Sequence, residues 1–441
     1  MNRTTPELPQ RRGTGVTRRR LLGGTAALTT GLFVPTAAGG TALAARRPSR
    51  TRLSLPAPTG PYAIGTVSLH LVDHARQDPW WTTPHARELM ISVWYPAQGA
   101  GRGHLAAWMP SGALAHYRQE LTAFLEQPDG PPGTPPPPQV SLDRVDFPIT
   151  HARQGAPVKR SARPYPMVLF EPGFGLGREL GTTLVEDLAS HGYVVVTISS
   201  TYDAAAVEFP DGRVEPARPD NFPRPNIDMI RRRADTLFVL DQLGALASGA
   251  NPDAEHRRLP SGLHRSLDLH KIGMFGHSLG GATTAQTMAV DDRIIAGVNL
   301  DGSIFPDFDL DTGPGEVEKE LARVAARIGN RPFLWLASGG FGPEYFGSLV
   351  TPFWYGLKGW RRFLSIKGST HFTYTDLTPM LHQLAAAGVI PSAAPVGIHP
   401  HQAIAAQRDY IRAFFDLWLR NRNTPAFDGP SARHPDVVFY P

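Results

Sequence analysis

A serine lies between two glycines in a spacing that suits a nucleophile. Residues 276–280 read Gly-His-Ser-Leu-Gly, which places Ser278 at the centre of a G-x-S-x-G pattern. The apolar run 271–275 before it predicts a strand, and the small residues 282–289 after it predict a helix. On such a turn the two glycines avoid collisions with the neighbouring strand and helix, and the strained serine projects out of the sheet. We expect Ser278 to attack acyl carbonyls; the alternative is a glycine-rich turn with a buried serine cap.

A serine hydroxyl needs a histidine to accept its proton and a carboxylate to hold that histidine. His371 follows the predicted strand 363–366 after a short Gly/Ser/Thr turn, and Asp301 stands at the carboxyl end of the predicted strand 294–300. The order serine, acid, histidine is typical of this type of nucleophile turn. We therefore expect Asp301 as the acid and His371 as the base. The rivals are His382, His399, His401 and His434, and Asp307, Asp309, Asp311 and Asp376.

The tetrahedral intermediate of acyl transfer needs two backbone N–H donors for its oxyanion. Leu279, directly after the nucleophile, is expected to supply one. Phe174 is expected to supply the other, from the glycine-rich loop 171–177 that follows the predicted strand 167–170. A nucleotide-binding interpretation of that loop is disfavoured, because no acidic residue closes a second strand at the required spacing. No metal or other cofactor is expected, since the His-x-His pair at 399–401 has no third ligand nearby.

Alternating strands and helices predict the sheet that positions these residues. Residues 64–72 and 89–95 alternate apolar and polar side chains, as in an antiparallel pair, and later short apolar runs fit a parallel sheet covered on both faces. With the nucleophile turn, the pattern predicts an α/β-hydrolase fold: a mostly parallel central sheet flanked by helices. The later strands are expected at 167–170, 193–198, 272–275, 294–300, 333–336 and 363–366, and helices at 180–190, 227–243 and 403–419.

The first 44 residues have the pattern of an export signal. Arg18, Arg19 and Arg20 precede an apolar, Gly- and Ala-rich run that ends in Ala42-Leu-Ala44, a small-x-small cleavage pattern. We expect a twin-arginine signal peptide over 1–44, cleaved near Ala44, and a secreted protein. Six of the 44 Lys and Arg residues and one of the 39 acidic residues lie there, so the remaining chain carries 38 of each. That balance gives no support for nucleic-acid binding.

The rest of the chain is expected to form an extended lead-in at 45–60 and one catalytic domain at 61–441. Two insertions interrupt the predicted fold: 105–138, with a helix and then a Pro-rich spacer, and 341–360, which is rich in aromatic residues. A third, polar segment at 203–225 is rich in proline. Insertions at the carboxyl edge of a sheet commonly build acyl pockets and lids, whereas the alternative for each is a surface loop or a satellite core.

Together the nucleophile turn, the acid, the histidine and the glycine-rich loop resemble the platelet-activating-factor acetylhydrolase family, the plasma and type II branch of the α/β-hydrolases. The resemblance spans roughly residues 60 to 375, and the 23 positions between Ser278 and Asp301 fit the family pattern. It implies that Ser278, Asp301 and His371 form the triad and that Phe174 and Leu279 supply the oxyanion amides. The loop Glu-Pro-Gly-Phe at 171–174 and the long stretch between Asp301 and His371 depart from the family. The resemblance rests on Val-Trp-Tyr-Pro at 93–96, Trp-Met-Pro at 108–110, Gly-Phe-Gly at 173–175 with Asp-Leu-Ala-Ser-His-Gly-Tyr at 187–193, Gly-His-Ser-Leu-Gly-Gly at 276–281, Asn-Leu-Asp-Gly at 299–302 and Phe-Pro at 305–306.

The resemblance implies a serine esterase that acts through an acyl-enzyme on short-acyl esters, such as the sn-2 acetyl group of platelet-activating-factor-like phospholipids. Its expected partners are small-molecule or lipid esters, with transient contact to a lipid surface left open. A general lipase or polyester hydrolase shares the triad and differs in pocket shape. A non-catalytic binding protein with the hydrolase fold is the alternative from another class. Acyl length, the alcohol part and the oligomeric state stay open at this point.

Overall fold

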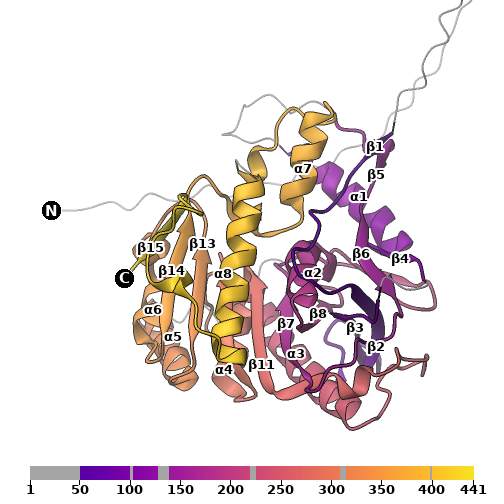
Figure 1. Ribbon diagram of the computed structural model, residues 1–441, viewed down its shortest axis with the longest axis horizontal. Helices are drawn as coiled ribbons and strands as arrows, with labels where there is room; N and C mark the ends of the chain where they lie inside the picture. Colours follow the sequence, from indigo (N-terminus) through magenta and orange to yellow (C-terminus); the bar gives the residue numbers. More distant parts are fainter. Residues whose placement is uncertain (1–49, 100–102, 128–138, 219–224, 308–313, 398–399) are drawn as a thin grey trace, which may run out of the picture. The chain divides into compact units, whose positions relative to one another are not determined.

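A large twisted sheet forms the centre of the protein, shown in Figure 1 as a computed structural model. The structure describes residues 50–99, 103–127, 139–218, 225–307, 314–397 and 400–441. The predicted signal peptide, the Pro-rich spacer at 130–138 and the rivals His399, Asp309 and Asp311 lie outside these residues. Within them, eleven strands follow the order β15-β14-β13-β12-β11-β7-β8-β3-β2-β6-β4. The bounds are β2 (Ile64–Gln77), β3 (Ala86–Pro96), β4 (Leu105–Ala107), β6 (Ile149–Gln154), β7 (Tyr165–Glu171), β8 (Val194–Ser200), β11 (Leu267–His277), β12 (Ile294–Leu300), β13 (Phe333–Ala337), β14 (Arg361–Ile366) and β15 (Val437–Tyr440).

The strands that hold the predicted site residues are parallel neighbours. β7, β11, β12, β13 and β14 pair in parallel, whereas β2 and β3 form the predicted antiparallel pair. Every residue of β7 is buried, because helices cover both faces of this part of the sheet. The carboxyl ends of these strands therefore meet at one edge, as the alternation of elements predicts.

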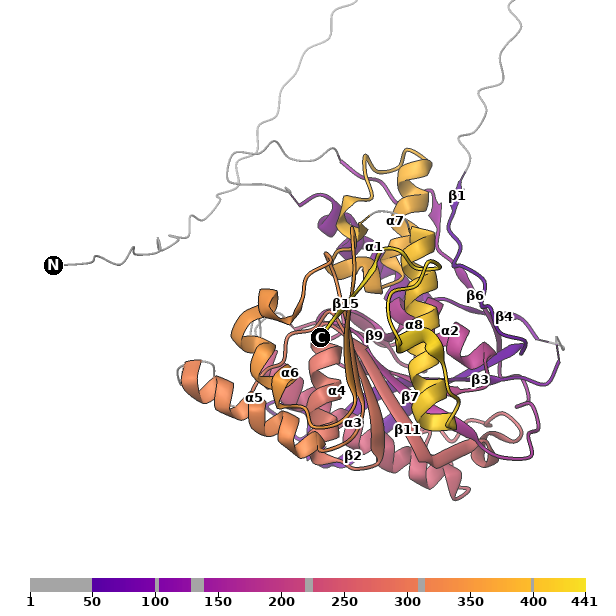
Figure 2. The same cartoon turned by 60° about the vertical axis from the view of Figure 1, so that its left-hand side comes forward.

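Helices cover the two faces of the sheet. In Figure 2, α3, α4 and α5 lie on one side, and α2 and α8 lie on the other. Two separate apolar clusters correspond to these faces, one with α3, α4 and α5 and one with α2 and α8. The helices are α1 (Ser111–Leu125), α2 (Thr182–Ser190), α3 (Pro225–Ala247), α4 (Leu279–Val290), α5 (Pro314–Ile328), α6 (Thr351–Gly356), α7 (Leu377–Ala386) and α8 (Pro400–Arg420). None of the helices in the described ranges combines the length and apolar character needed to cross a membrane.

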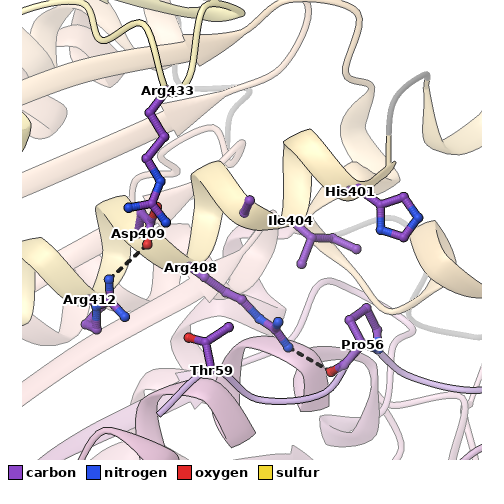
Figure 3. A pocket seen from close by; sticks show the side chains of 9 residues that line it. Pro56, Thr59, His401, Ile404, Arg408, Asp409, Arg412 and Arg433 are labelled. Carbon is purple, nitrogen blue, oxygen red and sulfur yellow. Dashed lines mark hydrogen bonds and ion pairs between the residues drawn. The ribbon is translucent and has the colours of Figure 1, made fainter.

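The described part of the lead-in is built into the fold. Strand β1 (Thr51–Arg52) pairs with β5 (Val145–Asp146), and the side chains of Leu53 and Leu55 are buried. Arg408 of α8 donates hydrogen bonds of 2.9 Å to the carbonyl oxygens of Pro56 and Ala57, and the contact with Pro56 is drawn in Figure 3. The described part of the lead-in therefore belongs to the same compact unit as the central sheet.

The insertions differ in how much of each is buried in a hydrophobic core. The first contains α1, whose buried face packs with α7 in a satellite core that includes Leu53, Leu55 and Trp108. The polar third segment forms a small hairpin of β9 (Ala206–Glu208) and β10 (Val214–Pro216). The aromatic insertion is split: Phe353 and Trp354 are fully buried in the main core. Phe341 and Tyr345 are exposed and stacked with their ring centroids 3.9 Å apart.

Candidate active site

The predicted nucleophile lies on a strained turn between β11 and α4. β11 ends at His277, and α4 begins at Leu279. Ser278 between them has φ 54° and ψ −121°, a backbone conformation that residues other than glycine rarely adopt. A Cβ atom on Gly276 would lie 2.2 Å from the backbone of Gly280, and one on Gly280 would lie 2.1 Å from the carbonyl oxygen of Glu171. Both glycines are thus required by close backbone approach, to the new helix in one case and to strand β7 in the other, as the sequence predicts.

The three predicted triad residues are joined by hydrogen bonds. Ser278 Oγ lies 2.9 Å from His371 Nε2, and His371 Nδ1 lies 2.7 Å from Asp301 Oδ2. Asp301 carries a carboxylate that can only accept, so the Nδ1 atom of His371 donates and its Nε2 atom is left to accept the serine proton. This is the tautomer that general-base catalysis requires.

Asp301 is held in place by groups on two neighbouring strands. It follows β12 with φ 56°, and the side chain of Asn299 closes the turn through bonds to both the N–H and the carbonyl of Gly302. After β13, Ser338 donates its backbone N–H to Asp301 Oδ1 at 2.7 Å and its hydroxyl to Asp301 Oδ2 at 3.0 Å. These bonds fix the plane of the carboxylate, and the side chain is only 4% exposed.

His371 begins a short 3-10 helix, η6 (His371–Tyr374), that follows β14. Its imidazole is 43% exposed, so substrate and water can reach it. The side chain of Thr373 accepts the backbone N–H of Thr370 at 2.7 Å and so closes the turn that presents His371. The backbone of His371 is also bound, because His277 Nε2 lies 2.9 Å from its carbonyl oxygen.

His277, next to the nucleophile, is neutral. A carbonyl can only accept, so His277 Nε2 carries the proton. Burial, with the nearby His371 as a smaller cause, lowers the pKa of His277 to about 3. Among the described residues, its buried Nδ1 atom has no hydrogen-bond partner. His277 therefore supports the backbone of His371 but is not placed to exchange protons with substrate.

One expected oxyanion donor directly follows Ser278, and the other lies in a loop that approaches the neighbouring His277. Leu279 is the first residue of α4, where backbone N–H groups point away from the helix and favour negative charge. Phe174 lies in the turn after β7, and its ring is partly exposed. A Cβ atom on Gly173 would lie 2.8 Å from Nδ1 of His277, so this loop runs against the elbow.

The rival residues that the structure describes have other partners. His382 Nε2 bonds the carbonyl of Gly397, and His434 Nε2 bonds Asp409. His401 lines a cavity beside α8 together with Arg408 and Arg433, as Figure 3 shows. Asp307 pairs with Arg233, and Asp376 accepts hydrogen bonds from Trp108 and from the N–H of Thr183. Within the described ranges, no group of three His, Cys, Asp or Glu residues is arranged to hold a metal.

Several supporting residues escaped the sequence analysis. Ser338 carries no motif, and it reaches Asp301 only because β12 and β13 are neighbours. Asn299 lies in the Asn-Leu-Asp-Gly stretch, but its role in closing the turn at Gly302 was not predicted. His277 lies inside the G-x-S-x-G pattern, but its middle positions are unrestricted, so nothing in the pattern indicates its role. Arg232 and Asp203, which bind the loop around Phe174, come from a helix and a loop far apart along the chain.

Comparisons with known proteins relate the chain to one family of esterases. The family model for platelet-activating factor acetylhydrolase, isoform II, matches residues 48–221 and 258–404. A probable 1-alkyl-2-acetylglycerophosphocholine esterase of Arthroderma benhamiae is 27% identical over 404 residues, which cover 87% of this chain and 93% of the fungal protein. The platelet-activating factor acetylhydrolase of Bos taurus is 30% identical over 169 residues, which cover 33% of this chain and 37% of the bovine protein.

A solved structure extends the likeness to the whole fold. The ferulic acid esterase from Streptomyces cinnamoneus superposes with a TM-score of 0.66 at 32% identity, covering 88% of this chain and 99% of that chain. The predicted fold and the predicted family resemblance are both confirmed. This chain is therefore a carboxylic-ester hydrolase with the α/β-hydrolase fold, and it belongs to the platelet-activating factor acetylhydrolase, isoform II, family.

Proposed function

We propose that the protein is a serine esterase that hydrolyses short-acyl esters through an acyl-enzyme on Ser278. The observation that carries this proposal is the hydrogen-bonded chain from Ser278 Oγ through His371 to Asp301, which lies at a solvent-accessible edge of the sheet. A serine with only a structural role would not need an oriented imidazole. Nor would it need a buried carboxylate that is held by two hydrogen bonds from Ser338.

In the acylation step, Ser278 Oγ attacks the ester carbonyl while His371 Nε2 takes its proton. The Asp301 carboxylate stabilises the imidazolium that forms. The carbonyl oxygen becomes an oxyanion, which the N–H groups of Leu279 and Phe174 stabilise. The intermediate collapses when His371 gives the proton to the leaving alcohol, and the acyl group stays on Ser278.

Deacylation repeats the cycle with water as the nucleophile. His371 removes a proton from water, the hydroxide attacks the acyl carbon, and the same two N–H groups hold the second oxyanion. The proton then returns to Ser278 Oγ as the carboxylic acid leaves. The neutral His277 beside the site does not repel the imidazolium that His371 becomes in each step.

We propose the sn-2 acetyl ester of platelet-activating-factor-like phospholipids as the preferred substrate. Support comes from the family and from the fungal relative, whose name specifies a 1-alkyl-2-acetylglycerophosphocholine esterase. The satellite core adds to it: Phe124 of α1 packs edge-on against Phe372, next to the base, with centroids 5.2 Å apart. An apolar wall beside His371 suits the alkyl chain of a lipid ester.

A second candidate substrate is an aromatic acyl ester of the feruloyl type. The observation that favours it is the 32% identity and 99% coverage of the ferulic acid esterase from Streptomyces cinnamoneus. Both candidates use the same triad, so they differ in substrate preference alone.

The test compares purified protein, Ser278→Ala and the control Ser141→Ala, which alters an exposed serine bonded only locally to Asp143. The substrates are a 1-alkyl-2-acetyl-phosphocholine, a long-acyl phosphocholine, p-nitrophenyl acetate and methyl ferulate. We expect fastest release of acetate from the phospholipid, abolished in Ser278→Ala and unchanged in Ser141→Ala. Faster turnover of methyl ferulate would favour the second candidate, and equal activity of Ser278→Ala would refute the serine mechanism.

We also propose that the protein is exported through the twin-arginine route. The support is the arginine run Arg18-Arg19-Arg20 before an apolar segment and the absence of cysteine from the whole sequence. Replacing all three arginines by lysine in the full chain should retain the protein inside the producing cell. The N-terminal sequence of the exported protein should begin near residue 45; unchanged export of the lysine variant would contradict this route.

A further inference from the structure

One buried arginine binds the glycine-rich loop 171–177, which contains Phe174. Arg232 of α3 is 1% exposed. It donates from Nη1 to the carbonyl oxygen of Pro172 at 2.5 Å and from Nη2 to that of Gly173 at 3.0 Å. Two consecutive carbonyls of the loop are therefore held by a single planar group.

Asp203 binds both Arg232 and the residue after Phe174. Its carboxylate binds Arg232 through two bonds, Nε to Oδ2 at 2.5 Å and Nη2 to Oδ1 at 2.7 Å. Asp203 Oδ1 also accepts the backbone N–H of Gly175 at 3.3 Å. The Arg232–Asp203 pair thus contacts the peptide group before Phe174 and the peptide group after it.

These contacts determine how the Phe174 amide is oriented. The N–H of Phe174 and the carbonyl of Gly173 belong to one planar trans peptide, so they point in opposite directions. When Arg232 holds the carbonyl, the N–H must point away from Arg232. The bond from Gly175 to Asp203 fixes the next peptide, and rotation of the Phe174 amide would break contacts on both sides.

We propose that Arg232 and Asp203 are positioning residues that orient the Phe174 N–H for the oxyanion of the reaction. This inference rests on the proposed serine esterase function and deepens it. A preorganised donor costs no reorganisation during the reaction, which is the main source of oxyanion stabilisation. A guanidinium bonded to the carbonyl of the same peptide also polarises that peptide and strengthens its N–H as a donor.

A buried ion pair is otherwise hard to justify at this position. Burying charges costs free energy that an apolar pair of the same volume would avoid. Burial alone shows this cost at the neighbouring Glu171: its Oε2 lies 3.6 Å from Arg232 Nη1, which favours the carboxylate, and yet burial raises the pKa of Glu171 to about 8. Lysine cannot replace Arg232, because a single ammonium lacks the fork that reaches two carbonyls and a carboxylate at once.

The experiment compares Arg232→Lys with the matched control Arg408→Lys. Arg408 is also a buried helix arginine that donates to two consecutive carbonyls, Pro56 and Ala57, and pairs with an aspartate. Each variant is tested for kcat and KM with p-nitrophenyl acetate, for inhibition by an alkyl trifluoromethyl ketone, and for Tm. The ketone forms an oxyanionic adduct with Ser278 and so reports on the oxyanion site directly.

We expect kcat of Arg232→Lys to fall about 10- to 100-fold with KM changed less than about threefold, below the loss of about 10² to 10³ for deleting a donor outright. The ketone should lose affinity by the same factor. Arg408→Lys should lower Tm with normal kcat and ketone affinity. Asp203→Asn, which keeps the shape of the side chain but loses the charge, should show the same pattern as Arg232→Lys and serves if that variant does not fold.

A kcat within about threefold of the unmodified protein in the folded variants would overturn the proposal, since loss of an oriented donor is far larger. So would a loss of kcat with unchanged ketone affinity, or an equal loss in Arg408→Lys. These outcomes leave the serine esterase function standing if Ser278→Ala is inactive. An inactive unmodified protein would instead refute the proposed function itself.

Discussion

Asp301→Asn should invert the tautomer of His371, the base of the proposed mechanism. The N–H of Ser338 donates to Asp301 Oδ1 at 2.7 Å, so an asparagine must keep its carbonyl oxygen at that position. Its amide group then faces His371 Nδ1, which now lies 2.7 Å from Asp301 Oδ2. Two N–H donors cannot face each other, and the imidazole adapts only by moving its proton to Nε2. The Nε2 atom then cannot accept the proton of Ser278.

The size of the loss in kcat distinguishes an inverted tautomer from the loss of one hydrogen bond. Loss of a charge-assisted hydrogen bond alone is worth about 2 kcal/mol, or about 30-fold in rate. A wrong tautomer removes the general base and costs about 10⁴-fold, which corresponds to about 5.4 kcal/mol of transition-state stabilisation. We expect the larger figure, because the Ser338 N–H leaves the amide no alternative orientation.

The assay is kcat for p-nitrophenyl acetate, with thermal unfolding to show that the variant is folded. Asp307→Asn is the control, since Asp307 pairs with Arg233 outside the site and undergoes the same chemical change. It should keep the full rate. A folded Asp301→Asn protein with a loss of about 30-fold or less would refute the tautomer argument, because the lost charge-assisted hydrogen bond alone would then explain it.

Two predictions concern stability. Burial raises the pKa of Asp376 to about 7, so the folded protein keeps a proton that an unfolded aspartate releases near about pH 3.9. Its contribution to stability is fully present below about pH 4 and is lost as the pH rises through about 7. Asp376→Asn should remove this loss, and urea unfolding across that range measures it; an unchanged pH dependence would count against a buried, protonated Asp376. Trp354 is fully buried, and Trp354→Ala should lower the free energy of unfolding by about 3–5 kcal/mol. The exposed neighbour variant Tyr355→Ala should change it by less than about 0.5 kcal/mol, and equal losses would contradict the burial argument.

The sequence was sufficient for features that depend on local pattern. Strong alternation and short apolar runs predicted eight of the eleven strands of the central sheet, because burial on one or both faces of a sheet imposes those periods directly. The short strands β4, β6 and β15 were not predicted. The nucleophile turn could also be predicted, because its two glycines have a fixed spacing around the serine. Gly276 is required by the backbone of Gly280 in the same strand–turn–helix unit, and Gly280 by the neighbouring strand β7. Asp301 and His371 could be chosen from several acids and histidines because each directly follows the carboxyl end of a strand or a short turn after it.

Other features depend on which strands become neighbours. Ser338 meets Asp301 only because β12 and β13 pair. Leu53 and Leu55 are buried because they pack in one apolar cluster with α1 and α7. Arg232 and Asp203 are ordinary polar residues in the sequence and acquire a role when α3 lies beneath the loop of Phe174. The residue types and their order along the chain thus determined the chemistry of the site. The tertiary structure decided which distant groups orient it, because hydrogen bonds between remote segments follow from packing and leave no periodic signal in the sequence.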